Sequence, residues 1–258
     1  MVRLVELVAP RTWGDAVLKA LAFLALINAL NFVVIDWVRG APFHVVSDLL
    51  NTTVVAAPFV AFAMAILHHQ RRLQQQLIWL ATTDMLTGLP NRRAFLARTA
   101  EATEGGRPGA LLVLDADHFK RINDRWGHAV GDACLKAIAE RLREALAPGD
   151  LAGRLGGEEF GAFLPGATRE RAATFGEGLC RALTVDATEV GGAGGATLAV
   201  TLSVGATLGG APTPLALLMA QADAALYRAK AEGRARLVFW SDPESAPEAP
   251  DQPGSQAA

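Results

Sequence analysis

Apolar positions divide the chain into two regions of different character. Two long apolar runs lie near its start, from Ala16 to Val38 and from Leu49 to Leu67. Each run is about the length that a helix needs to cross a hydrocarbon layer of roughly 30 Å. Pro58 lies inside the second run, and membrane helices tolerate proline where neighbouring groups satisfy the freed carbonyl. The pattern therefore predicts two transmembrane helices, 16–38 and 49–67, within an N-terminal region of residues 1–72.

Basic residues gather at the outer ends of these two runs, at Arg3, Arg11, Lys19, Arg71 and Arg72. The segment that joins the runs contains Arg39 alone and is too short for a sensor domain. Because basic residues of membrane proteins concentrate on the cytoplasmic side, both chain ends are expected in the cytoplasm. The sequence predicts a multi-pass protein of the inner (cytoplasmic) membrane, with the lipid bilayer as a partner. A cleaved signal peptide would need neither the second run nor its basic flank.

Polar residues interrupt both apolar runs, with Asn28 and Asn31 in the first and Asn51, Thr52 and Thr53 in the second. Such amides and hydroxyls form hydrogen bonds between membrane helices. They also mark ligand sites in some membrane proteins. We favour the structural role.

The segment 73–83 is expected to be a helical linker, because leucines recur at Leu73, Leu77 and Leu80 with glutamines between them. A dimeric coiled-coil stalk would explain this seam, but the segment is shorter than the three or four heptads that define one. A single amphipathic helix packed on the next domain explains it nearly as well.

Downstream, short apolar strands alternate with amphipathic helices. Strands are predicted at 111–117, in a hairpin over 151–164, at 197–208 and at 235–240, and helices at 129–146, 169–183 and 214–231. The order βαββαβ is typical of an α+β fold with a ferredoxin-like core. We expect one catalytic domain over residues 84–240, followed by a disordered tail rich in proline, serine and acids over residues 241–258.

Composition narrows the range of functions. The formal net charge of the 258 residues is −2, so the chain lacks the basic excess that binds a nucleic acid polymer, and no such partner is expected. Cys134 and Cys180 show no metal-ligand spacing, and we expect free thiols.

Two acidic pairs lie at predicted turns. Asp115 and Asp117 are separated by one residue at the end of a strand, so both carboxylates are expected on one face, which suits a hard divalent cation. Glu158 and Glu159 follow two glycines, whose missing Cβ lets phosphate or metal approach the backbone. If the strand and the hairpin are neighbours, Asp115 and Glu158 converge on Mg²⁺. Either pair alone carries little weight, because acidic turn residues are usually solvated.

Four segments resemble, in order, the motif blocks of the GGDEF family of diguanylate cyclases: Asp84–Arg93, Leu114–Asp132, Arg154–Phe160 and Ala225–Arg234. Glu158 takes the third position of the GGDEF motif, a variant that active members also use. The resemblance implies a nucleotidyl-cyclase palm that condenses two GTP molecules into cyclic di-GMP, with release of two pyrophosphates.

The resemblance also implies a metal site and a catalytic base. Asp115, the carbonyl of Ala116 and Glu158 would hold Mg²⁺, with Mn²⁺ as the alternative ion. Glu158 would also accept the proton of the attacking 3′-hydroxyl, and Glu159 would assist. These roles fit general chemistry, because a metal polarises the α-phosphate while a carboxylate receives the proton.

Asn123, His128 and Asp132 match the substrate pocket of the family. The Asp132 carboxylate can accept hydrogen bonds from the guanine N1–H and N2–H₂ edge, which adenine does not offer. His128 either contacts the base or orders the loop at the start of a helix, and both roles stay open. The wall of the pocket and its first turn are expected at Asp84, Leu86 and Asn91.

Lys120, Lys230 and Arg234 match the cationic positions that meet the triphosphate, together with backbone N–H groups near His118 and Phe119. Cations in this place would stabilise a leaving pyrophosphate. Lys230 and Arg234 also have the spacing of cations that complement a helix dipole. We favour the phosphate role for both.

Two positions depart from the family pattern. Ala235 stands where members commonly have asparagine, which is expected to remove one capping or loop hydrogen bond. The product-inhibition motif of the family, RxxD, ends six residues before Gly156, and here Asp150 is present but Ala147 replaces the arginine. A lone carboxylate repels a dianionic ligand, so no inhibitory site is expected here unless other arginines supply one.

The resemblance implies a homodimer, because each subunit would carry half of the reaction site. A different class of function is a catalytically inactive GGDEF module that binds nucleotide or a protein partner. Degenerate members usually lose acids from the hairpin or the strand, whereas this chain keeps them. We therefore favour the enzyme. A purely structural membrane protein would leave the four blocks unexplained.

Overall fold

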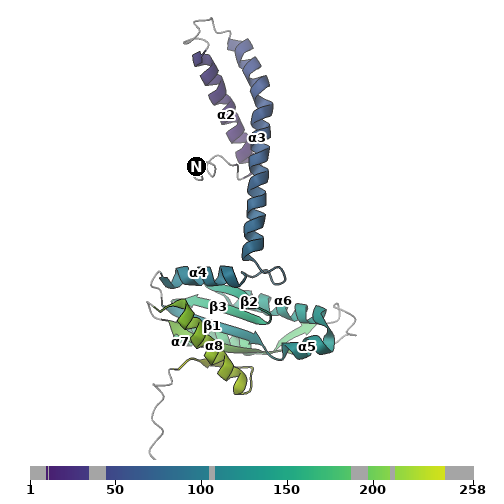
Figure 1. The fold of residues 1–258 in the computed structure, drawn as a ribbon, viewed down its shortest axis with the longest axis vertical. Helices are drawn as coiled ribbons and strands as arrows, with labels where there is room; N and C mark the ends of the chain where they lie inside the picture. The colour runs from purple at the N-terminus through teal and green to yellow at the C-terminus, as the bar shows by residue number, and fades with distance from the viewer. Residues whose placement is uncertain are drawn as a thin grey trace, which may run out of the picture. The chain divides into compact units, whose positions relative to one another are not determined.

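The computed structural model describes residues 10, 12–34, 45–104, 108–186, 197–209 and 213–241. The chain forms two compact units, residues 1–81 and residues 82–258, and the boundary falls inside the expected linker 73–83 (Figure 1). Residues 39–44 of the expected loop and all but the first residue of the expected tail lie outside the described residues, whereas residues 45–48, also expected in the loop, belong to a helix.

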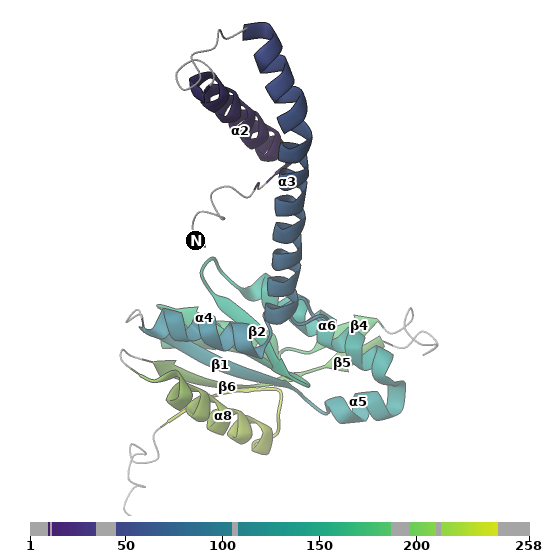
Figure 2. The ribbon, with the colours of Figure 1, turned by 45° about the horizontal axis from the view of Figure 1, so that its top comes forward.

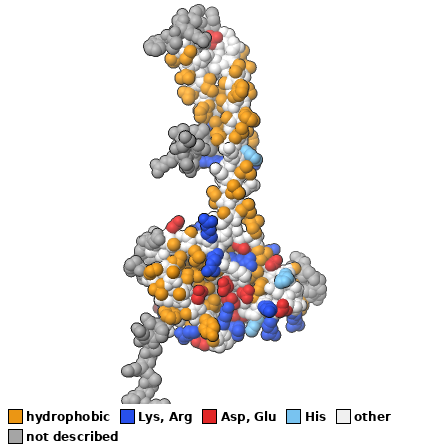
Figure 3. All heavy atoms as spheres, in the orientation of Figure 1, with side chains coloured by type: hydrophobic (Ala, Val, Ile, Leu, Met, Phe, Trp, Pro, Cys, Tyr) orange, Lys and Arg blue, Asp and Glu red, His pale blue; other side chains and the backbone are white. Residues whose placement is uncertain are grey.

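The first unit contains two helices, α2 (Trp13–Val33) and α3 (Val45–Thr82). Both are long and apolar enough to cross a membrane, judged by length and composition. Thr12 begins α2, because its hydroxyl accepts a hydrogen bond from the amide of Asp15 at 3.2 Å. Hydrophobic side chains cover the surface of this unit (Figure 3). Phe59, for example, is 71% exposed.

Polar side chains join α2 to α3. Asn28 Nδ2 donates to Thr53 Oγ1 at 3.1 Å, and Asn31 Nδ2 donates to Thr52 Oγ1 at 2.6 Å. These are hydrogen bonds between helices, the structural role that the sequence analysis favoured for these polar residues. The helix α3 then continues through the expected linker as far as Thr82.

The second unit is built on a five-stranded sheet in the order β2-β3-β1-β6-β7. Its strands are β1 (Gly109–Ala116), β2 (Leu151–Gly156), β3 (Glu159–Pro165), β6 (Leu202–Gly209) and β7 (Leu237–Phe239). All neighbours are antiparallel except β6 and β7, which are parallel. The arrangement of β2, β3, β1 and β6 confirms the expected α+β fold with a ferredoxin-like core.

Helices cover both faces of this sheet. They are α4 (Arg92–Glu104), α6 (His128–Ala145), α7 (Arg169–Cys180) and α8 (Leu215–Ala231), and a short α5 (Phe119–Trp126) follows β1. Leu111 and Val113 of β1 belong to a core cluster with residues of α4 and α8, and α8 runs along β6 (Figure 2). Leu112 and Leu114 belong to the cluster with α6 and α7. Asp115 continues the face of Leu111 and Val113 and therefore points toward the α8 side.

The segment 197–208, expected as one strand, is two strands in the structure. β5 (Thr197–Val200) pairs with β4 (Leu183–Asp186) in a separate two-stranded sheet, and β6 pairs with β1. The break falls at Thr201, whose carbonyl accepts from the amide of Asp117 and whose hydroxyl donates to the Asp117 carboxylate. The helix expected over 169–183 ends at Cys180, because Leu183 already belongs to β4.

Candidate active site

The end of β1 lies against the turn between β2 and β3. Asp115 is directly opposite Glu159 in the β1–β3 ladder. The amide of Ala116 donates to the carbonyl of Glu158 at 3.2 Å. The strand and the hairpin are therefore neighbours, the condition on which convergence of the two acidic pairs depends. Figure 3 shows acidic side chains gathered beside lysine and arginine side chains on one face of this unit.

The β2–β3 turn needs glycine for its backbone angles. Gly156 has φ 148° and Gly157 has φ 47°, and a Cβ built on either would meet nothing within 4 Å. The requirement is conformational, since residues with a Cβ rarely adopt these angles. The register of β2 also shifts between Arg154 and Gly156, and such a bulge redirects side chains near a turn.

Asp115 forms an ion pair with Lys230 of α8. The Lys230 Nζ lies 2.8 Å from Asp115 Oδ2, and the two side chains are 34% and 9% exposed. Burial raises the pKa of Asp115, and the nearby Lys230 opposes that rise. The charge of Asp117 adds to the rise of this pKa, and the charge of Arg234 opposes it.

Asp117 is held differently from Asp115. Ser203 Oγ donates to its Oδ1 at 2.6 Å, and Thr201 Oγ1 donates to its Oδ2 at 2.7 Å. The amide of Ala235 also donates to Oδ2, at 3.1 Å. The residue is buried. The sequence suggested two equivalent acids for a cation, but the Asp117 carboxylate is already occupied by protein donors.

Asn123 lies against α6 at Gly131, the residue before Asp132. A Cβ on Gly131 would be 1.9 Å from Asn123 Oδ1, so only glycine at 131 allows this approach. Asn123 Oδ1 is buried and has no hydrogen-bond partner in the described part of the chain. His128 begins α6, and both His128 and Asp132 are exposed. The structure therefore brings these three residues, predicted for the substrate pocket, to the junction of α5 and α6.

The predicted phosphate-binding positions come from two turns. His118 has φ 57° and precedes α5, whose first amide N–H groups have no partner within the helix. Phe119 is buried, and Lys120 is exposed in the same helical turn. Arg234 follows α8 with φ 65°, and its amide donates to the carbonyl of Ala229 at 3.0 Å.

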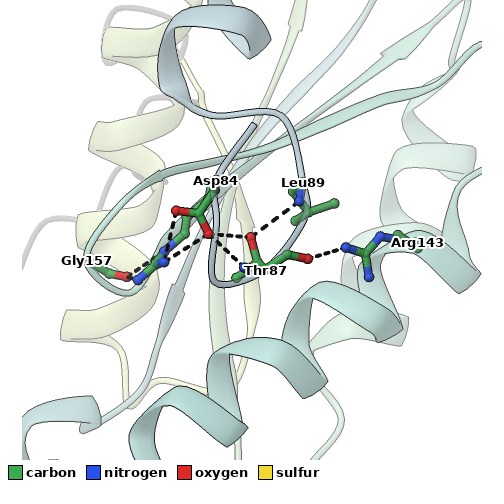
Figure 4. Close-up of polar contacts among 6 residues, drawn as sticks. Asp84, Thr87, Leu89, Arg143 and Gly157 are labelled. Atoms are coloured by element: carbon green, nitrogen blue, oxygen red, sulfur yellow. Dashed lines mark hydrogen bonds and ion pairs between the residues drawn. The ribbon is translucent and has the colours of Figure 1, made fainter. Parts of the chain in front are cut away.

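Arg154 is a site residue to which the sequence analysis gave no role. Its Nη1 lies 3.0 and 3.2 Å from the two carboxylate oxygens of Asp84, and its Nη2 donates to the carbonyl of Gly157 at 2.7 Å. Thr87 donates to Asp84 through both its amide and its hydroxyl (Figure 4). Burial acts to raise the pKa of Asp84, but the hydrogen bonds from Thr87 and Arg154 outweigh it and lower the pKa. The signal for this contact was the position of Arg154 two residues before the glycine pair.

Asp150, the remaining acid of the product-inhibition motif, is also occupied by protein donors. Arg171 Nη2 lies 2.7 Å from both of its carboxylate oxygens, and the amide of Ala147 donates to Oδ2 at 2.8 Å. Its side chain is 3% exposed.

Among the described residues, no three His, Cys, Asp or Glu side chains form a metal-binding group. Cys134 and Cys180 are free and buried, as expected. Burial raises the pKa of Cys134 to about 11 and that of Cys180 to about 12, so neither is a ready thiolate.

The family model described as "Diguanylate cyclase, GGDEF domain" matches residues 81–236. The chain is 43% identical over 161 residues to the diguanylate cyclase DgcP of Pseudomonas aeruginosa, a match that covers 61% of this chain and 24% of DgcP. It is 41% identical over 165 residues to the response regulator PleD of Caulobacter vibrioides, covering 62% of this chain and 36% of PleD. The matched region is thus well under half of either relative.

A solved structure with similar architecture is the coiled coil and GGDEF domain of DgcB from Caulobacter crescentus in complex with c-di-GMP. Its TM-score is 0.62 at 32% identity, and the match covers 72% of this chain and 99% of that one. The diguanylate cyclase SiaD of Pseudomonas aeruginosa, solved with its activator SiaC, has a TM-score of 0.57 at 35% identity and covers 75% of each chain.

Proposed function

Because this chain belongs to the GGDEF family, we propose that it is a diguanylate cyclase that condenses two GTP molecules into cyclic di-GMP and releases two pyrophosphates. The observation that carries this proposal is the pairing of β1 with the β2–β3 turn. It sets Asp115 opposite Glu159 and joins the amide of Ala116 to the carbonyl of Glu158. Lys230, 2.8 Å from Asp115, adds a cation to this acidic edge.

The donor set at this edge fits Mg²⁺, with Mn²⁺ as the alternative. Asp115, Glu158 and the Ala116 carbonyl offer only hard oxygen ligands, and Mg²⁺ is usually held by one or two carboxylates plus substrate phosphates. When bound, the ion would supply charge stabilisation at the α-phosphate.

Guanine recognition is assigned to the junction of α5 and α6. Among the described residues, Asn123 Oδ1 is a buried acceptor without a partner, and such a group is stabilised by a ligand N–H. Asp132 is exposed one residue beyond the Gly131 contact and can accept from the guanine N1–H and N2–H₂ groups. His128 either contacts the base or orders the start of α6.

The triphosphate is assigned to the turn before α5 and the end of α8. Backbone N–H groups at His118 and Phe119 and the side chain of Lys120 would bind its oxygens. Lys230 and Arg234 would approach from the other side and stabilise the charge of the leaving pyrophosphate.

The reaction forms a bond between the 3′-oxygen of one GTP and the α-phosphorus of the other, and breaks the bond from that phosphorus to the β-phosphate bridge. Glu158 accepts the proton of the attacking hydroxyl, and Glu159, opposite Asp115, assists in holding the reacting groups. Pyrophosphate leaves with the electrons of the broken bond. A second, symmetric transfer closes the ring.

Each subunit would bind one GTP, so the reaction requires a homodimer. The helix α3 offers a surface for it, since Leu73, Leu77 and Leu80 are 45%, 65% and 52% exposed. The described likeness to the coiled coil and GGDEF domain of DgcB supports a helical stalk at this place.

Product feedback through the RxxD position is proposed to be absent. Ala147 supplies no guanidinium, and the carboxylate of Asp150 is bound at both oxygens by Arg171.

We place the protein in the inner membrane as a multi-pass protein with its catalytic unit in the cytoplasm. Two apolar helices and the exposure of their large side chains support contact with the lipid bilayer. The basic residues at Arg71 and Arg72 support the orientation.

The test is direct: the full chain, purified in detergent micelles, is incubated with GTP and Mg²⁺ and the products are separated by chromatography. Cyclic di-GMP and pyrophosphate are expected, and EDTA is expected to stop their formation. ATP serves as the control substrate. Binding of GTP without any product would instead support the inactive nucleotide-binding module.

A further inference from the structure

Asp117 connects three parts of the second unit at one carboxylate. It follows β1, and its oxygens accept hydrogen bonds from Thr201 before β6, from Ser203 within β6, and from the amide of Ala235 after α8. The residue is 6% exposed. A buried carboxylate with three protein donors is satisfied without a metal ion.

The turn after α8 has an unfavourable backbone that this contact stabilises. Arg234 has φ 65° and Ala235 has φ 49°, and residues with a Cβ disfavour this left-handed region. Backbone bonds also hold the turn, from the amide of Arg234 to the carbonyl of Ala229 and from the amide of Val204 to the carbonyl of Arg236. Within the turn, Arg236 Nε donates to the carbonyl of Arg234 at 3.2 Å. The bond from the Ala235 amide to Asp117 ties its left-handed part to the sheet.

This turn determines where the Arg234 side chain lies. Arg234 follows Lys230 by four residues, and the side chain of Lys230 ends at Asp115, so the turn sets how the Arg234 side chain approaches the acidic edge. Lys230, one helical turn earlier, reaches the same carboxyl. Movement of the turn would withdraw Arg234 while leaving Lys230 on its helix.

We propose that Asp117 is a positioning residue: its carboxylate fixes the left-handed turn at Arg234 and Ala235 and so directs Arg234 to the triphosphate, and it does not itself bind the metal. The inference rests on the proposed function, because the phosphate role of Arg234 belongs to that proposal.

The test measures binding of a GTP analogue with an α,β-methylene bridge, in the presence of Mg²⁺, to the full chain in detergent micelles by calorimetry. Asp117→Ala is expected to weaken binding about tenfold, the size of one lost hydrogen bond to a charged group. Arg234→Ala should weaken binding by a similar factor. The double variant should be no weaker than Arg234→Ala alone, because both changes remove the same contact. Additive losses would overturn the proposal.

Asp117→Asn separates positioning from metal binding. The asparagine oxygen can face Thr201 and the amide of Ala235, while its NH₂ donates to Ser203 Oγ, so all three contacts can survive. Binding within about threefold of the parent is expected, as for a neutral exchange of hydrogen-bonding groups. Loss equal to that of Asp117→Ala would show that the charge matters and would overturn the assignment.

Ala235→Val provides a second approach that leaves Asp117 and the core intact. Ala235 is exposed, and a β-branched residue is a strong outlier at positive φ. The same loss of analogue binding is expected, with no further loss in the Arg234→Ala background. Unchanged binding would contradict the proposal even if Asp117→Ala fails to fold.

Amide hydrogen exchange in the ligand-free protein separates this inference from the proposed function. The Ala235 amide is expected to exchange slowly in the parent and in Asp117→Asn, and fast in Ala235→Val. A parent that binds no GTP analogue would reject the proposed function, and the exchange rates would still decide whether Asp117 holds the turn. Equal exchange in parent and Ala235→Val would overturn the inference by itself.

Discussion

The two units of this chain use their apolar residues in opposite ways. In the described part of the first unit, Ala16 and Met64 are the buried hydrophobic residues, while side chains such as Phe59 and Leu26 are 71% and 61% exposed. The second unit buries both faces of its central strand, where Leu111 through Leu114 are at most 1% exposed. The first unit therefore exposes its apolar side chains, as the proposed membrane location requires, whereas the second unit buries its own.

The difference indicates that the first unit serves the location of the protein and the second unit serves its chemistry. Hydropathy and length are the grounds for the membrane location proposed for the first unit, and its polar residues Asn28 and Asn31 bond to the neighbouring helix. In the second unit the core only places the edge of the sheet. The chemistry depends on which side chains the strand ladder brings to that edge.

Removal of the proposed catalytic base should have the largest effect and should affect chemistry alone. Glu158→Gln is expected to lower turnover by about 10³-fold, within the usual range for a lost general base. Glu158 lies in the β2–β3 turn, so the melting temperature should stay near that of the parent. Initial rates of pyrophosphate release and a thermal melt of the same preparation measure both. Full activity in Glu158→Gln would reject the assignment.

Asp115→Asn tests whether Asp115 also serves chemistry and not stability, and the pKa of Asp115 sets the pH at which to measure this. Burial raises the pKa of Asp115 above its ordinary value of 3.8, although Lys230 opposes this. The folded state then holds the proton more tightly than the unfolded state, so the contribution of Asp115 to stability falls as pH rises from about 4 through the folded pKa. At pH 8 the variant should melt no lower than the parent, yet turn over GTP far more slowly. A lower melting temperature would show that the ion pair stabilises the fold.

Charges placed in the first unit should reduce its insertion into the membrane. Leu26→Arg and Phe62→Arg each put a charge on an exposed apolar surface of a proposed membrane helix. A charge at the centre of such a helix costs about 2.5–3.5 kcal/mol on insertion scales, or roughly a hundredfold. Membrane fractionation should show that both arginine variants are lost from the membrane pellet. Arg71→Glu, which changes a basic residue after the second apolar run, serves as a control for orientation. Retention of both arginine variants in the pellet would contradict the membrane assignment.

Much of the fold could be predicted because its patterns are local. Alternation along β1, the glycine pair at 156 and 157, and the amphipathic α6 each follow from neighbouring residues. The division of 197–208 into β5 and β6 could not be predicted, because its cause is Asp117, more than eighty residues earlier in the chain. Alternation continues across the break, so the sequence shows one strand.

The site could be predicted as motifs but not as contacts. Asp115, Glu158 and Lys230 were identified by resemblance, whereas the ion pair between Asp115 and Lys230 required the packing of α8 on the sheet. For the same reason Arg154 was given no role, and Asp117 was paired with Asp115 for a cation and not with the turn after α8. Their partners, Asp84 and Ala235, are distant in sequence.

Arg154→Ala should have a smaller effect that falls on stability as well as activity. Arg154 joins Asp84 to the carbonyl of Gly157, and the ion-paired side chains are 14% and 23% exposed. Loss of hydrogen bonds to a charged group is expected to cost about 1.5–3 kcal/mol of unfolding free energy. Because the pKa of Asp84 is lowered, its contribution is present above pH 3.8 and is lost as pH falls through the folded pKa. Urea unfolding at pH 7 and pH 3 measures this, and an equal loss at both would contradict the assignment.

Restoring the product-inhibition motif at residues 147 and 150 should change the rate of the enzyme a few-fold when cyclic di-GMP is added. Added cyclic di-GMP should leave the initial rate of the parent unchanged, since Arg171 holds Asp150 at 2.7 Å. Ala147→Arg supplies the missing guanidinium, but Arg171 still occupies the Asp150 carboxylate. Inhibition should therefore appear only when Ala147→Arg is combined with Arg171→Ala, because the new guanidinium and the Asp150 carboxylate are then both free to bind the ligand. Ala147→Lys with Arg171→Ala is the matched control, with charge but without the bidentate fork. Inhibition of the parent would show a feedback site elsewhere.

Ala235→Asn should give the smallest effect, and of opposite sign to the others. Ala235 is exposed with φ 49°, and asparagine tolerates the left-handed region better than alanine does. The amide donor to Asp117 is kept. A gain of about 0.5–1 kcal/mol is expected, which raises the melting temperature by roughly 1–4 °C in a domain of this size. Ala231→Asn is the matched control, because Ala231 is exposed at the end of α8 and asparagine has the lower helix propensity. If both variants lower the melting temperature, the turn is not strained, and the role given to Asp117 in holding it becomes unnecessary.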